Sequence, residues 1–566
     1  MIRTSLACAL IPFLALAGCS NDETTPVTTG TGGGGGMGGA GGTGAGELDV
    51  GEVTTEEGAG SDTVEIVIDT PTGTEQFIAM VLAAKTDIGS LYSYTAAATP
   101  TGTGQMSGDV HVEPKICITT LAAPLQPQPK AKPPKHRPWS AYQDDINQIR
   151  DARIKRGKPF TNPWENGGPP PDPPPNEGET RQFEIRDGNN VIQTIDAEAI
   201  KVTAELVIYM DRTTPGAGDI GQTDLDDIAA RFGDVVLPRE RIFFGQESDV
   251  NDDGHVSVLF SPLTYEHAVA YVSPWDLITD PNEQPPGVVT NNQELLYLTP
   301  PDVIPAPYNT PRAIVETMAH EFQHAIYFYR KYMLNDQFGE DENAYVTEGL
   351  SALAQDLTGY AAGNLYVTKH GLDSINDFSA ARAIGGGLGY HDDLDGALRG
   401  GAYLFMRYLY DQAGGDTLDG SGEVTDTDHG AAWLRGFVDS VELGWENVEA
   451  STGRETRDVL ADWYAAMMID DRGPDGADLS TDPVYNYLPV AECPITNAPR
   501  GMSMFLPFHG QGMEGPPIQV LTEADGSLTA GGADYLSFGA AEAGQTTLTV
   551  TSEVAADLIV TVVRTE

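Results

Sequence analysis

Hydrophobic and polar positions alternate in the stretch DTVEIVIDTPTG at residues 62–73, a pattern typical of β-strands with one buried face. The same period of two returns near the C-terminal end, in QTTLTVTSEVAADLIVTVVRT at residues 545–565. We therefore expect a small β-rich module over residues 62–120 and a second, sandwich-like β module over residues 485–566.

The middle of the chain predicts strands first and helices afterwards. Strand patterns occupy 199–211, the apolar run after the Asp-rich turn DVNDDG (residues 249–254), and 294–300, with a short helix at 224–237. Beyond residue 310 the apolar spacing becomes helical, with candidates over 310–333, 345–358, 396–413, 430–441 and 454–469. This order predicts an α+β domain over residues 181–484.

The remaining segments are compositionally simple. Residues 1–18 have a positive residue, Arg3, before a short apolar run, which predicts a secretory signal peptide. The Gly-rich residues 19–61 predict a flexible tether. Residues 121–180 are rich in proline and predict spacers around a short helix at about 140–156.

The signal ends in Leu16-Ala17-Gly18-Cys19, which resembles the lipobox of bacterial lipoproteins. The resemblance implies that Cys19 carries lipid and that the protein is an outer-membrane lipoprotein or otherwise at the cell surface. The alternative is ordinary secretion. The two cysteines that remain in the mature chain, Cys117 and Cys493, would share an oxidising compartment, and we expect them to form one disulfide.

The net charge is extreme, −51 over 566 residues. Such a chain would be repelled by nucleic acid and by anionic lipid, so a nucleic-acid partner is excluded and the membrane is expected to be reached only through the N-terminal lipid. The acidity either keeps a solvated surface soluble or contributes to binding of cations such as calcium.

The strongest chemical motif is HEFQH within TMAHEFQHAIYF, residues 317–328. On a helix, His320 and His324 lie one turn apart on the same face, where two imidazoles can bind one zinc ion. Glu321 would lie beside them as the base that takes a proton from the attacking water. The alternative is a pair of histidines on an ordinary buried helix.

A catalytic zinc needs a third protein ligand. Glu348 begins a second helical stretch, TEGLSALAQDL, 24 residues after His324, and an antiparallel return would bring its first turn beside the histidines. Small residues after Glu348 would permit close helix packing. The alternative role for Glu348 is a favourable carboxylate at a helix N-terminus.

HEFQH with the downstream Glu-Gly-x-Ser helix resembles the gluzincin metallopeptidases, and most closely the hyicolysin-like secreted neutral metallopeptidases. The resemblance extends over about residues 200–415 and includes DVNDDGHVSVLFSPL, NNQELLYL and GGAYLFMRYLYDQAGG. It implies a zincin-like catalytic domain, zinc ligands His320, His324 and Glu348, and Glu321 as catalytic base. Some gluzincins have an acidic residue four positions after the third ligand, where this chain has Ala352, so another group must orient the histidine rings.

Two further roles stay open at this point. The donor that stabilises the oxyanion could be Tyr390, His391 or Tyr403, although Tyr403 lies in an apolar helix where core packing is the more natural role. Asp249, Asn251 and Asp253 match the first half of a calcium loop, but position twelve would be Phe260, so either distant ligands complete a calcium site or these residues form an Asx-rich turn.

These expectations define a zinc metallopeptidase that hydrolyses peptide bonds of extracellular proteins or peptides. The alternative from another class is a non-catalytic binding or adhesion lipoprotein on a peptidase-like scaffold. Glu321 favours the enzyme, because a scaffold without catalysis has no need of the base.

Overall fold

The computed structural model describes most of the chain from residue 46 onwards. All described residues fall within one unit of the chain, Gly39–Glu566. No helix in this part of the chain is both long enough and apolar enough to cross a membrane. The described residues are 46–58, 60–84, 91–100, 141–156, 173–216, 218–279, 284, 287–306, 308–335, 342, 344–361, 395–505, 513–521, 524–552 and 556–566.

A six-stranded sheet forms the first part of the expected α+β domain. Its strands follow the order β10-β11-β9-β8-β7-β6. The three adjacent strands β11, β9 and β8 are parallel, whereas β6, β7 and β10 pair in antiparallel orientation. The strands are β6 (Thr180–Arg186), β7 (Ile192–Val202), β8 (Leu206–Asp211), β9 (Val256–Phe260), β10 (Ala270–Val272) and β11 (Leu295–Leu298).

The single strand expected over 199–211 is a hairpin between β7 and β8. Thr203 makes the turn: its backbone N–H donates to the carbonyl of Leu206 at 2.9 Å, and its hydroxyl accepts from the Leu206 N–H at 3.1 Å. The prediction was wrong here because apolar residues continue on both sides of the turn, so the alternation does not reveal the reversal.

β8, β9 and β11 are buried at every position and almost entirely apolar, because both faces of the sheet are covered. Ile208 and Val258 face the large core that the helices share, while Tyr209 and Leu259 pack into a separate core on the opposite face. Alternate residues of one strand therefore serve two different cores, as the period of two requires.

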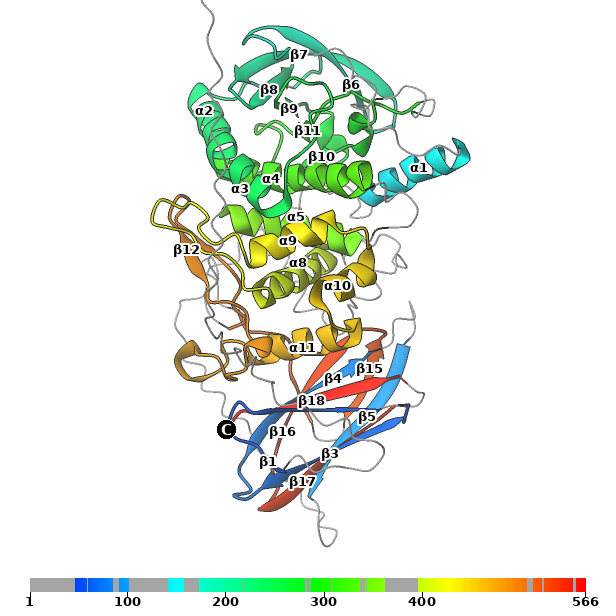
Figure 1. The fold of residues 1–566 in the computed structure, drawn as a ribbon, viewed down its shortest axis with the longest axis vertical. Coiled ribbons are helices and arrows are strands. Elements are labelled where there is room, and N and C mark those ends of the chain that lie inside the picture. The colour runs from blue at the N-terminus through cyan, green and yellow to red at the C-terminus, as the bar shows by residue number, and fades with distance from the viewer. Residues whose placement is uncertain are drawn as a thin grey trace, which may run out of the picture. The chain divides into compact units, whose positions relative to one another are not determined.

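Helices cover the first of these faces, with α2, α3 and α4 beside the sheet (Figure 1). All five helices expected after residue 310 are present, with ends displaced by a few residues. The helices are α1 (Ala141–Arg156), α2 (Gln222–Arg231), α3 (Leu237–Phe244), α4 (Pro311–Tyr327), α5 (Ala344–Thr358), α8 (Asp395–Gln412), α9 (Gly430–Asp439), α10 (Gly444–Thr452) and α11 (Thr456–Ile469).

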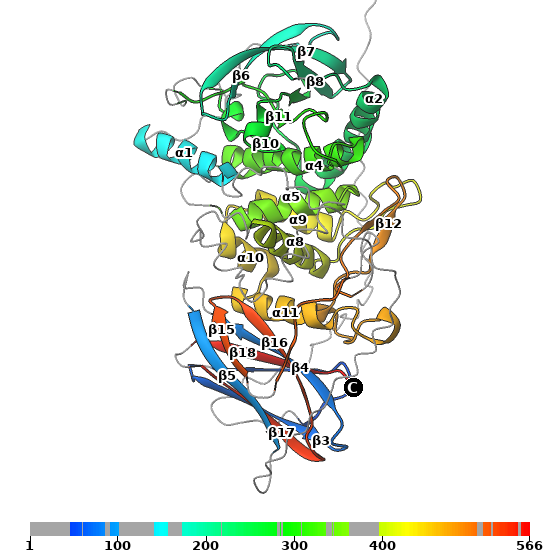
Figure 2. The same ribbon diagram turned by 180° about the vertical axis from the view of Figure 1, so that it is seen from behind.

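A ten-stranded sandwich contains strands from both ends of the described chain. One sheet has the order β1-β3-β17-β5-β15 and the other β14-β16-β4-β18-β2. Figure 2 shows the blue N-terminal and red C-terminal strands interleaved. The strands are β1 (Gly46–Glu47), β2 (Val53–Glu57), β3 (Thr63–Thr70), β4 (Gln76–Ala83), β5 (Leu91–Pro100), β14 (Gln519–Val520), β15 (Ala524–Thr529), β16 (Ala533–Gly539), β17 (Gly544–Ser552) and β18 (Leu558–Arg564).

The expectation of two separate β modules, over 62–120 and 485–566, is therefore corrected to one sandwich. β4 pairs with β16 and β18, and β17 pairs with β3 and β5. The reason is that β4, with sequence QFIAMVLA, is buried along nearly its whole length and needs a partner on each side. The expected tether over 19–61 is also too long at its C-terminal end, since β1 and β2 already belong to the sandwich.

The sandwich is joined to the helical part through α11. The Tyr464 hydroxyl donates to the carbonyl of Gly531, and the Tyr535 hydroxyl donates to the carbonyl of Tyr464, both at 2.8 Å. Met80 of β4 and Trp463 of α11 belong to the same buried cluster. A further small hairpin, β12 (Ala491–Cys493) with β13 (Ala498–Arg500), precedes the C-terminal strands.

Candidate metal centre

α4 presents the two histidines of HEFQH on one face. The helix begins as expected, with Thr310 as N-cap accepting from the Ala313 N–H at 3.3 Å and Pro311 in the first turn. The imidazole rings of His320 and His324 are 4.9 Å apart and nearly perpendicular. His324 is buried, whereas the His320 side chain keeps 15% of its surface exposed, so the pair lies at the edge of the core.

α5 supplies the third residue. It lies between α4 and α8 (Figure 1, Figure 2), which brings Glu348 to the histidines as the sequence predicts. Glu348 Oε2 is 3.3 Å from His320 Nε2, and Oε1 is 3.6 Å from His324 Nε2. One ligand atom from each of the three residues lies within 4.8 Å of the others.

These distances suit a zinc ion. Two atoms that bind one zinc at about 2.1 Å with tetrahedral angles lie about 3.4 Å apart. His320 Nε2 lies 3.3 Å from Glu348 Oε2, and His324 Nε2 lies 3.6 Å from Oε1, so each nitrogen is close to that distance from a different oxygen of the same carboxylate. Two imidazole nitrogens and one carboxylate oxygen are also a donor set that zinc accepts in catalytic sites, where a fourth position stays open.

Glu321, the expected base, follows His320 directly on α4. Its side chain is buried, with 8% of the residue exposed. Because residues three apart on a helix are neighbours, Glu321 shares a side of α4 with His324. Glu321 is therefore one helical turn from His324, in a part of the protein that is largely shielded from water.

Ser351 is a contact that the sequence did not predict. Its hydroxyl oxygen lies 3.1 Å from His324 Nδ1 and also donates to Gln323 Oε1 at 2.7 Å. The sequence left open which group orients the histidine rings, since Ala352 replaces the acidic residue of some gluzincins. The same oxygen is 3.3 Å from His324 Nε2, so Ser351 contacts the edge of the ring; the available signal was its position three residues after Glu348, on the same face of α5.

Arg399 of α8 is the second unpredicted contact. Its Nη1 donates to Glu348 Oε2, the oxygen that also faces His320. Burial of Glu348 acts to raise its pKa, but the Arg399 guanidinium and the two histidines outweigh this and lower the pKa to about 2. The carboxyl group is therefore held in the ionised form that a metal ligand must have.

Of the three candidates for the oxyanion donor, the structure describes only Tyr403. Tyr403 is fully buried in α8, and burial first, then the nearby Asp356, raises its pKa well above the ordinary value. A phenol without exposed surface fits the packing role that the sequence also favoured. Tyr390 and His391 lie outside the described residues.

The Asp-rich turn contains one Asx-turn bond, in which Asp253 Oδ1 accepts from the N–H of His255 at 2.7 Å. Asp249 Oδ1 accepts from the N–H of Asp253 at 2.9 Å, and Asp253 Oδ2 accepts from Asn251 Nδ2 at 2.9 Å. Phe260, at position twelve of the calcium-loop pattern, is buried in β9 and offers no oxygen ligand. These bonds account for the residues as a turn, and calcium binding at Asp249, Asn251 and Asp253 stays a prediction.

Cys493 is buried at the end of β12 and forms no disulfide with another described residue. Arg239 Nη1 lies 3.3 Å from its sulfur. Cys117 and the lipidation candidate Cys19 lie outside the described residues, so the disulfide and the lipid anchor stay predictions.

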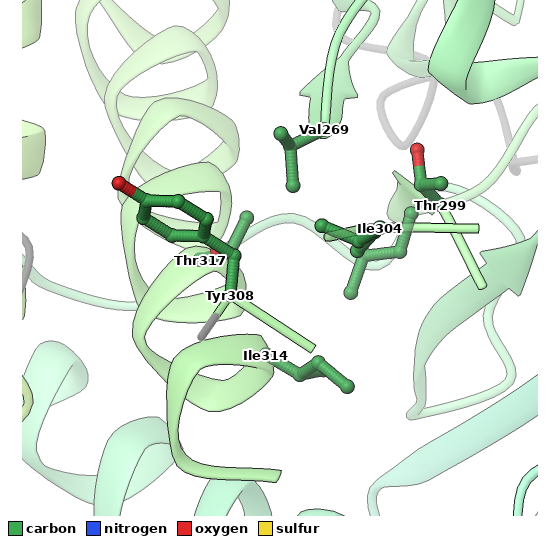
Figure 3. Close-up of a pocket in the computed structure, with 7 residues that line it drawn as sticks. Val269, Thr299, Ile304, Tyr308, Ile314 and Thr317 are labelled. Atoms are coloured by element: carbon green, nitrogen blue, oxygen red, sulfur yellow. The ribbon is translucent and has the colours of Figure 1, made fainter. Parts of the chain in front are cut away.

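A small apolar hollow lies beside the first half of α4 (Figure 3). Thr317 contributes to it and precedes His320 by three residues, about 4.5 Å along the helix axis. Thr317 and His320 are partly exposed, whereas the residues of α4 between them and on either side are buried. The two residues therefore lie on the same partly exposed side of the helix. The lining residues are Val269, Leu298, Thr299, Ile304, Tyr308, Ile314 and Thr317.

In comparisons with known proteins, no family model matches the chain, and no curated protein matches it.

Proposed function

We propose that this protein is a zinc-dependent metallopeptidase that hydrolyses peptide bonds of extracellular proteins or peptides. The observation that carries the proposal is the convergence of His320, His324 and Glu348 from two helices, with distances of 3.3 and 3.6 Å between nitrogen and carboxylate oxygen. Glu321, next to His320 on α4, adds the base that peptide hydrolysis at such a site needs.

A zinc ion held by the three residues would polarise the scissile carbonyl and make the attacking water more acidic. Glu321 takes the proton from that water and afterwards gives it to the leaving amine. Ser351 holds the ring of His324, and the shielded position of Glu321 strengthens its electrostatic interactions, because surrounding water is sparse.

The location proposed for this activity is the cell envelope, through lipid on Cys19, with ordinary secretion as the alternative. The lipid would be the only membrane contact. In this arrangement the substrates are proteins or peptides outside the cytoplasm.

The test compares the chain beginning at Ser20 with its Glu321→Gln variant, both loaded with zinc, on an unfolded protein substrate. The parent is expected to cleave, a chelator to stop the cleavage, and added zinc to restore it. The variant is expected to bind zinc like the parent and to lose cleavage by several orders of magnitude, because glutamine cannot accept the proton.

Two other outcomes have defined meanings. Equal cleavage by parent and variant would show that a contaminant is responsible. Zinc binding with no cleavage by the parent on any substrate would favour the non-catalytic binding protein instead.

A further inference from the structure

The close approach of α8 to α5 depends on one glycine. A Cβ atom at Gly349 would lie 2.7 Å from the carbonyl oxygen of Ala402 and 2.7 Å from Cγ of Met406. Both distances are too short for a real side chain, so only glycine permits this separation of the helices. Gly349 follows Glu348, and Ala402 lies one turn after Arg399, so the contact brings Arg399 to Glu348.

Glu348 is held from two sides. Its Oε2 accepts from Arg399 and faces His320, while its Oε1 faces His324. Its side chain keeps 4% of its surface exposed, and that of Arg399 keeps 18%. A glutamate has several rotatable bonds, and a charge-assisted hydrogen bond from a planar guanidinium restricts where its carboxylate can point.

We propose that Arg399 is a positioning residue of the metal centre, which holds the Glu348 carboxylate so that its two oxygens face the two histidines. The proposal rests on the metal centre of the proposed function. It does not need Arg399 to touch substrate: the guanidinium acts through Glu348. The Glu348 carboxylate held in this way would bind a divalent cation that accepts nitrogen and oxygen donors. Zinc is the cation used in the test.

The test measures zinc affinity of the full chain, purified in detergent, by competition with a chromophoric chelator. The Arg399→Gln variant is expected to bind zinc about 10- to 100-fold more weakly than the parent, the range seen when a partner that orients a metal ligand is removed. Arg399→Lys keeps the charge but not the planar fork and should lie between the two. Gly349→Ala, which pushes α8 away, should also weaken binding.

Cobalt(II) provides a readout that a general loss of stability would not produce. Its visible absorption depends on coordination geometry, so a displaced Glu348 should change the spectrum of the loaded Arg399→Gln protein. Arg330→Gln is the matched control, because Arg330 also pairs with a carboxylate, that of Asp439, but lies six residues beyond His324. It should bind zinc and cobalt like the parent.

Zinc affinity and a cobalt spectrum equal to the parent's in Arg399→Gln would overturn the proposal. If the glutamine variant does not fold, the lysine variant decides, and affinity equal to the parent's overturns it. These results leave the peptidase proposal intact, since that is judged by Glu321→Gln. A parent that binds zinc but never cleaves removes the peptidase alone, and a parent that binds no zinc removes both.

Discussion

The hydroxyl oxygen of Ser351 on α5 lies 3.1 Å from Nδ1 of His324 on α4. The contact links a helix that bears two candidate zinc ligands to the helix that bears the third. The Ser351 hydroxyl also lies within hydrogen-bond distance of Gln323 Oε1 on α4 and of the Thr347 carbonyl on α5, and its single hydrogen can be donated to either acceptor.

We predict that Ser351→Ala lowers zinc affinity by about tenfold, because the His324 ring loses the group that orients it. Circular dichroism should show an unchanged fold, and chelator competition measures the affinity. Ser552, whose hydroxyl donates to the carbonyl of Ser93 in the sandwich, offers the control Ser552→Ala with unchanged affinity. Unchanged zinc binding in Ser351→Ala would rule out an orienting role.

We predict that the free energy of unfolding depends on pH because of Glu294, the residue just before β11. Burial raises the pKa of its carboxyl from the ordinary 4.5 to about 7, although bonds from Ser248 and Val250 lower it in part. Its Oε2 has no hydrogen-bond partner among the described residues. Since the folded pKa is above the unfolded one, the folded state binds the extra proton, and its stabilising effect is lost as pH rises from about 4.5 to 7.

We therefore expect the free energy of unfolding to fall across this window, with Glu294 contributing at most about 1.4 kcal/mol for each pH unit. Glu294→Gln cannot ionise and should flatten this part of the curve. Urea unfolding of both proteins at several pH values measures the effect. Parallel curves for parent and variant would contradict the assignment.

We predict that the C-terminal strands of the sandwich do not fold when the N-terminal strands are removed. A chain that begins at residue 181 lacks β3, β4 and β5, so β17 loses both neighbours and β16 and β18 lose β4. Such a chain should aggregate or be rapidly proteolysed, because unpaired strand edges and one side of the sandwich core become exposed. Size-exclusion chromatography and limited proteolysis measure this.

The control is a chain that begins at residue 45, which keeps every described strand. A folded and soluble chain from residue 181 would instead favour the view that the N-terminal region is a removable propeptide. The pairing of the strands argues for a structural role.

The sequence by itself determined features that depend on neighbours along the chain. The helix from Thr310, the shared face of His320 and His324, and the apolar alternation of β3 and β17 all follow from local spacing and capping. Glu348 was predicted because one short loop limits where the next helix can return. These features agree with the structure because few arrangements satisfy the local pattern.

Tertiary structure decided which distant segments meet. The continuous apolar run of β4 specifies a strand with two buried faces but not its partners, and these come from more than 450 residues away, as the register of Val81 with Asp534 shows. Arg399 lies 51 residues after Glu348, and their contact follows from the helix approach at Gly349. Such pairings depend on the packing of the whole core, which no local pattern encodes.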